Sequence, residues 1–197
     1  MSYLRSSTAR AWGRVASDYD ERRAKEKLAL ETKSYSVAKT YDVFLSHSFK
    51  DAVLILGVKR LIEALDLTVY VDWVEDPTLD RECVTVATAA LLRARMKSCR
   101  SLVYAHSANS KDSAWMPWEL GYFDGFKQHL IWILPVVEES DHEFKGQEYL
   151  GLYPTVKVLS DIRRTELGFT KVGTPGRDIP LKEAIATGGV FFTAAAG

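Results

Sequence analysis

The sequence predicts one doubly wound α/β domain, in which helices cover both faces of a parallel sheet. Strand-like and helix-like segments alternate from Thr40 to about residue 160, which is typical of this class. The strand-like segments are mostly continuous apolar runs, as expected for strands that are buried on both faces. The chain has 197 residues, of which 47% are hydrophobic, enough for one domain with a sizeable core.

The first elements follow directly from these patterns. Tyr41–Ser46 (YDVFLS) is expected to be a buried strand, and Asp51 can cap a helix that runs to about Leu65. Thr68–Trp73 (TVYVDW) is expected to be the second strand. An alanine-rich helix then covers residues 83–98, with cations near its carboxyl end, where they suit the helix dipole.

The remaining elements continue the alternation. Pro135 places the end of the fourth strand near an edge of the sheet, because proline cannot donate a hydrogen bond to a neighbouring strand. The expected elements are a third strand at Ser101–His106, a helix over about Ala114–Lys127, a fourth strand at Leu130–Val137, a fifth strand at Thr155–Leu159 and a short helix at Pro180–Thr187.

The flanking segments differ from this core. Residues 1–39 are rich in Arg, Lys, Glu, Ala and Ser, and the stretch from Ser7 to about Lys33 is expected to be helical. This extension is interpreted either as a solvated helix or as an oligomerisation or regulatory arm. The predicted organisation is an N-terminal helical extension (1–39), the α/β domain (40–160) and a tail that packs on or extends the domain (161–197).

Composition excludes several classes of function. Twenty-six basic and 26 acidic residues balance, so nothing draws the chain as a whole to nucleic acid or to an anionic membrane. No apolar run approaches the roughly 20 residues of a membrane span, and the N-terminus has no signal-peptide core. Cys83 and Cys99 are expected to be reduced, with no metal site and a cytoplasmic location.

A carboxylate that could take part in catalysis lies in the segment SAWMPWELGY, residues 113–122. Pro117 suits the first turn of a helix, and Glu119 then lies near the positive end of the helix dipole, which favours its ionised form. Trp115 lies four residues earlier and shares a helix face with Glu119. An aromatic plane beside a fixed carboxylate could serve a flat, partly cationic substrate. An acid in a first turn is also an ordinary helix stabiliser.

Two other loops should meet Glu119 at one edge of the sheet, because ligands of doubly wound sheets bind beyond the carboxyl ends of the strands. The first strand leads into Ser46–Asp51, and the second ends at Asp72 and Trp73 before the loop Val74–Glu82. Such an open edge is expected to exclude water poorly. Each loop also has a structural reading, since Ser48 or Asp51 can cap a helix and Trp73 can pack under a loop.

Taken together, YDVFLSHSFKD, VYVDW and SLVYAHSANSKDSAWMPWELGY resemble a bacterial-type Toll/interleukin-1 receptor (TIR) domain over about residues 40–160. The resemblance implies a flavodoxin-like, five-stranded parallel sheet. Many members of this family hydrolyse or cyclise NAD, and the glutamate of their Trp-x-x-x-Glu pattern, here Glu119, is catalytic. Other members only assemble signalling complexes through self-association. In bacteria several act in antiphage defence, where they make a nucleotide signal for an effector or deplete NAD.

The chemistry agrees with this resemblance. Nicotinamide leaves NAD as a neutral molecule, so its departure needs no general acid, unlike that of an ordinary sugar leaving group. One carboxylate can stabilise the oxocarbenium-like transition state. The sequence has no GxGxxG motif and no P-loop, so we expect NAD as a substrate rather than a redox cofactor. Expected substrate contacts are Ser46, His47, Phe49, Lys50, Asp72, Trp73 and Trp115.

Three functions therefore remain open at this level. The leading prediction is an NAD nucleosidase or ADP-ribosyl cyclase with Glu119 as its catalytic residue. A non-enzymatic TIR interaction module is the main alternative, and an enzyme similar to nucleoside deoxyribosyltransferases is a more distant one. The loop after Trp73 lacks the glycine often found there in the family, which leaves its conformation and its part in self-association open.

Overall fold

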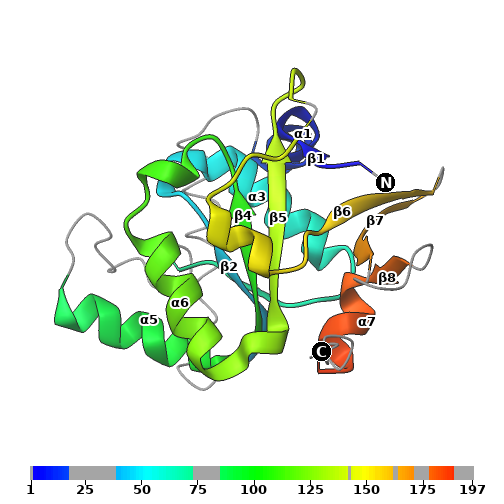
Figure 1. The fold of residues 1–197 in the computed structure, drawn as a ribbon. Coiled ribbons are helices and arrows are strands. Elements are labelled where there is room, and N and C mark those ends of the chain that lie inside the picture. The colour runs from blue at the N-terminus through cyan, green and yellow to red at the C-terminus, as the bar shows by residue number, and fades with distance from the viewer. Residues whose placement is uncertain are drawn as a thin grey trace.

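The computed structural model describes residues 2–17, 39–72, 85–141, 143–161, 164–170 and 178–188. Its centre is a five-stranded, all-parallel sheet with strand order β1-β5-β4-β2-β3 (Figure 1). The order reverses direction beside the first core strand, as in doubly wound folds, so the predicted fold class is confirmed. The strands are β1 (Leu4–Arg5), β2 (Tyr41–Ser46), β3 (Val69–Tyr70), β4 (Cys99–His106) and β5 (Ile131–Val137).

Helices cover both faces of this sheet (Figure 1). On one face, α1 (Ser6–Ser17) and α3 (Ala52–Glu63) pack on alternate strand residues such as Val43 and Leu45. On the other, α5 (Val86–Ser98) and α6 (Trp115–Lys127) pack on the intervening residues such as Phe44. Both sets of strand side chains are therefore buried, which explains the continuous apolar runs in the sequence.

Most core elements match the sequence-based predictions. The first strand, the helices α3, α5 and α6, and the short α7 (Leu181–Ala186) lie where they were expected. The second strand is shorter than predicted, since only Val69–Tyr70 pair with β2. Short 3-10 helices connect the longer elements: η2 (Phe49–Asp51), η3 (Ser110–Asp112), η4 (Gln128–Leu130) and η5 (Glu148–Leu152).

Residues 2–17 are part of the domain, so the expectation of a solvated extension is wrong for them. β1 pairs with the end of β5, and Leu4 and Ala9 are fully buried. α1 approaches α3 so closely that a Cβ atom on Gly57 would lie 1.7 Å from the carbonyl oxygen of Ala9. Small residues make this contact, which is why the sequence shows only a thin apolar stripe there. Residues 18–38 of the predicted arm lie outside the described part of the chain.

The prediction that Thr155–Leu159 forms the fifth strand of the main sheet is also wrong. Residues around Thr155–Leu159 form β6 (Lys157–Asp161), which belongs to a separate antiparallel sheet with β7 (Arg164–Thr170) and β8 (Asp178–Pro180). Thr155 makes only an isolated bridge to Ile133. Lys157, which begins β6, suits a sheet with one solvated face better than a strand covered on both sides. The position it was expected to fill is taken by β1.

Pro135 does not mark a sheet edge, because β5 lies between β4 and β1. The pairing of β5 with β4 ends at His106 and Pro135, and its pairing with β1 begins at Leu4 and Val136. The missing N–H of the proline therefore falls where the neighbours of the strand change, so the sheet tolerates it.

Candidate active site

Glu119 is held inside the protein at the carboxyl edge of the sheet. Its side chain is 0% exposed, and its Oε2 accepts a hydrogen bond of 2.6 Å from Oγ of Ser46 at the end of β2. Glu119 is the fifth residue of α6, one turn beyond the helix start, where the dipole effect has faded. The serine hydroxyl, rather than the helix terminus, is thus the donor that the structure places on this carboxylate.

This burial corrects one expectation from the sequence. The site was expected to lie on an open edge that excludes water poorly, yet Ser46, His47 and Glu119 are each 0% exposed within a single chain. A low-polarity surrounding strengthens electrostatic interactions with any substrate that enters. It also means that the groups covering Glu119 must move before a substrate can reach it.

His47 and Asp72 form a second buried pair from the two predicted loops. Nδ1 of His47 lies 2.7 Å from the carbonyl oxygen of Leu45, and because a carbonyl only accepts, this nitrogen carries the proton. Nε2 of His47 lies 3.7 Å from Oδ1 of Asp72, which is 1% exposed. The structure therefore brings the ends of β2 and β3 together behind the site. The sequence predicted this, because both loops follow strands of one parallel sheet.

Asp51 ties the loop after β2 to the loop after β4. Its carboxylate accepts hydrogen bonds from Oγ of Ser107 at 2.6 Å and from Nδ2 of Asn109 at 2.7 Å. The predicted capping role of this side chain is wrong, because Asp51 makes no side-chain capping bond to α3. Ser48 does act as a cap, accepting a hydrogen bond from the backbone N–H of Lys50. Asp51 instead fixes the loop that leads into the helix carrying Glu119.

Two predicted contact residues lie at the surface. Phe49 is 40% exposed, and Nζ of Lys50 pairs with Oδ2 of Asp112 at 2.9 Å. The hydrogen bond from Lys50 lowers the pKa of Asp112 below its ordinary value. Such exposed ion pairs contribute little stability, so Lys50 could exchange this partner for a phosphate group. Its role toward NAD stays a prediction.

Trp115 lies on the buried face of α6 together with Glu119, as their spacing predicted. It is 6% exposed and packs edge-on against Trp118, with ring centroids 5.4 Å apart. Arg93 of α5 covers the ring of Trp118 at 5.3 Å. Trp115 is therefore mostly core in this structure, and its contact with a substrate stays a prediction. Trp73 and the loop Val74–Glu82 lie outside the described residues.

Sequence reasoning missed two tyrosines beside the site. Tyr104 is the partner of Ser46 in the register of β2 and β4, and it is fully buried. Burial raises the pKa of its hydroxyl, and the neighbouring Tyr149 and the charge of Glu119 add to the rise. Tyr104 therefore stays neutral at any physiological pH. The position of Tyr104 beside the site follows from the parallel pairing of β2 with β4, and the sequence carries no local pattern for it.

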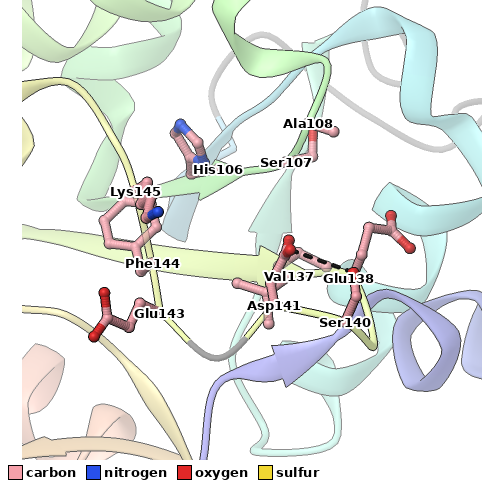
Figure 2. A pocket seen from close by; sticks show the side chains of 11 residues that line it. His106, Ser107, Ala108, Val137, Glu138, Ser140, Asp141, Glu143, Phe144 and Lys145 are labelled. Atoms are coloured by element: carbon pink, nitrogen blue, oxygen red, sulfur yellow. Dashed lines mark hydrogen bonds between the residues drawn. The ribbon is translucent and has the colours of Figure 1, made fainter.

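A cavity of about 460 Å³ opens at the carboxyl ends of β4 and β5 (Figure 2). His106 projects from the end of β4 on one side, with its ring centroid 4.9 Å from that of Phe144. Glu138 and Asp141 from the turn after β5 line the other side. Burial lowers the pKa of His106 below its ordinary value, so its imidazole is neutral at neutral pH.

Comparison with known proteins places this chain in a family. The chain is 56% identical over 144 residues to "Probable 3' cyclic ADP-D-ribose synthase ThsB'" of Bacillus cereus (strain MSX-D12), covering 73% of this chain and 74% of the relative. The chain belongs to the bacterial TIR-domain family of cyclic ADP-D-ribose synthases. The TIR resemblance seen in the three sequence segments is thereby confirmed.

A second relative of this TIR family covers a shorter stretch. It is a candidate cyclic ADP-D-ribose synthase named TIR2 from Cytobacillus dafuensis, 34% identical over 94 residues, which are 47% of this chain and 25% of the relative. No family model matches the chain. Within the described residues, no helix is long and apolar enough to cross a membrane, and no group of three or more His, Cys, Asp or Glu side chains could hold a metal ion.

Proposed function

We propose that this chain cleaves the bond between nicotinamide and ribose in NAD and closes the remaining ADP-ribose into a cyclic nucleotide. The observation that carries the proposal is the buried carboxylate of Glu119, bound by Ser46 at the carboxyl edge of the sheet. The relative that shares 56% identity is named as a cyclic ADP-D-ribose synthase. A purely non-enzymatic module is disfavoured, because both relatives are named as synthases.

Glu119 would act on the transition state. As the positively charged nicotinamide departs with the bonding electrons, positive charge develops on the ribose ring. An ionised carboxylate beside the ring stabilises that charge, and it does so most strongly where water is excluded. No general acid is needed, because the leaving group becomes neutral when the bond breaks. Ser46 would hold the carboxylate in one orientation through its 2.6 Å hydrogen bond.

The remaining expected contacts complete a proposal for substrate binding, with NAD as substrate and no cofactor. Lys50 would leave its exposed ion pair with Asp112 and meet the pyrophosphate, since ammonium groups bind phosphate as point charges. Phe49 offers an exposed aromatic face. His47, Asp72, Trp73 and Trp115 are proposed to shape the pocket around the nicotinamide half.

The TIR resemblance also supports proposals about partners. Copies of the chain would associate through their TIR domains, and the cyclic nucleotide would be recognised by an effector protein in antiphage defence. We expect this to take place in the cytoplasm, where the reduced thiol of Cys99 is stable.

The direct test is release of nicotinamide from NAD by the purified chain and by Glu119→Gln, which keeps the size of the side chain and removes its charge. Loss of this electrostatic stabilisation should lower the rate by about 100-fold or more. Glu183→Gln, an exposed acid in the first turn of α7, is the matched control and should keep the parental rate. If folded Glu119→Gln consumes NAD as fast as the parent, the proposed role is wrong.

A further inference from the structure

The cavity at the ends of β4 and β5 lies beside the proposed reaction centre. His106, which lines it, follows Tyr104 by two residues, and Tyr104 is the register partner of Ser46. With a rise of 3.3 Å per residue and 4.8 Å between strands, the Cα atoms of His106 and Ser46 are about 8 Å apart. Residues two apart on a strand share a face, so His106 lies on the α6 side of the sheet, as Glu119 does.

The walls of the cavity are held by contacts from the N-terminus. Nη1 of Arg5 donates to the backbone oxygens of Glu138 at 2.8 Å and Asp141 at 2.7 Å. Oγ of Ser6 donates to the carboxylate of Glu138 at 2.7 Å. These bonds fix the turn after β5 that forms one side of the cavity, while Phe144 and His106 form the other (Figure 2). The cavity is therefore built by the fold before any ligand arrives.

Its lining suits a nucleoside better than a phosphate. A volume of about 460 Å³ lies in the range of small-molecule sites. Phe144 and the imidazole of His106 supply aromatic surface, and the carboxylates of Asp141 and Glu143 accept hydrogen bonds. Ribose hydroxyls and the exocyclic amine of adenine are donors that match these acceptors. Phosphate oxygens would be repelled by the same carboxylates, although Lys145 at the rim offers one cation.

We propose that this cavity receives the adenosine half of NAD, and that His106 accepts the proton of the ribose hydroxyl that closes the ring. The inference rests on the proposed NAD cleavage and adds the step that follows it. The bond from the anomeric carbon to nicotinamide breaks, and nicotinamide keeps the electron pair. The adenosine hydroxyl oxygen forms a bond to the same carbon. Its proton passes to the imidazole and then to solvent, so that NAD gives cyclic ADP-ribose, nicotinamide and one proton.

His106 has the properties that this step requires. Burial lowers its pKa, so the imidazole is free to accept a proton at neutral pH. A positioned general base commonly accelerates a step by about 10²–10⁴-fold. Water competes with the hydroxyl for the anomeric carbon and gives linear ADP-ribose. The base acts only on the hydroxyl route, and saturating NAD offsets weaker binding of the adenosine half. Loss of either should therefore change the product and leave nicotinamide release at saturating NAD largely intact.

The experiment is to incubate the full chain with saturating NAD and to quantify nicotinamide, cyclic ADP-ribose and linear ADP-ribose together by chromatography. We expect His106→Gln to release nicotinamide within about threefold of the parent, while the ratio of cyclic to linear product falls at least tenfold. Phe144→Ala, which opens the cavity and removes the ring packed on His106 but keeps the imidazole, should lower the same ratio. His129→Gln replaces an exposed histidine of η4 and should leave the ratio unchanged.

Each other outcome is decisive. An unchanged product ratio in His106→Gln would overturn the inference, and so would a parent that makes only linear ADP-ribose; either leaves NAD cleavage standing. Loss of all nicotinamide release in a folded His106→Gln would also overturn it, by assigning His106 to bond cleavage. A parent that releases no nicotinamide would instead refute the proposed function, and the inference with it.

Discussion

Gly57→Ala should separate α1 from α3 and measure how firmly the N-terminus belongs to the domain. The added Cβ would lie 1.7 Å from the carbonyl oxygen of Ala9, whereas ordinary contacts begin near 3.4 Å, so the helices must part by about 1.7 Å. The obstacle is backbone, which no rotamer change relieves. Overpacking costs about 1–3 kcal/mol or more. The higher helix propensity of alanine offsets up to about 1 kcal/mol of this cost. We expect a net loss of about 2 kcal/mol in the free energy of unfolding.

The assay is thermal and urea unfolding of the full chain. A loss of about 2 kcal/mol lowers Tm by about 4–8 °C for a chain of this length. Gly121→Ala is the matched control, because it lies in the interior of α6 with no heavy atom within 4 Å of the new Cβ, and it should be neutral or stabilising by up to about 1 kcal/mol. A Gly57→Ala protein that unfolds at or above the parental temperature would refute the close packing of α1 on α3.

Two further predictions concern the site. Ser46→Ala removes the hydroxyl that donates to the buried Oε2 of Glu119. Because hydrogen bonds to charged groups contribute about 1.5–3 kcal/mol, nicotinamide release should fall about tenfold or more and the urea midpoint should drop. Parental values of both would show that the bond is dispensable. Specific activity should rise with protein concentration, because the TIR resemblance implies that neighbouring copies assemble. Flat activity across a broad dilution series, with monomeric mass by light scattering, would remove assembly from the mechanism.

The elements that could be predicted are those whose sequence carries a long and uninterrupted signal. Val43–Leu45 and Ile131–Val137 are apolar throughout because both of their faces are covered. β1 has only two residues, too few for any pattern. The contact of α1 with α3 depends on Ala9, Gly13 and Gly57, and small residues leave no apolar stripe to recognise.

In the candidate site, too, some contacts could be predicted from the sequence and others could not. The approach of Ser46 to Glu119 follows from strand order, because loops at the carboxyl ends of neighbouring parallel strands meet. Tyr104 and His106 depend on register, which the sequence does not reveal: only the pairing of Ser46 with Tyr104 shows which residues of β4 share the α6 face. Phe144 and Tyr149 depend on the way residues 143–153 fold back over the strand ends, a long-range arrangement without a local pattern.

The burial of Glu119 bears on the choice between hydrolysis and ring closure. In the proposed reaction, a carboxylate that is 0% exposed would stabilise the cationic transition state strongly, but the same enclosure would keep water away from the anomeric carbon. Hydrolysis would therefore need water to be admitted deliberately, whereas ring closure needs only a nucleophile that the substrate already carries. A hydroxyl held beside the reacting carbon can act at an effective concentration of about 10⁵ M or more, far above that of any water that leaks in. Loops tied by Asp51, Ser107 and Asn109 and by Arg5 suit such a closed site, because they hold the strand ends together around a folded substrate.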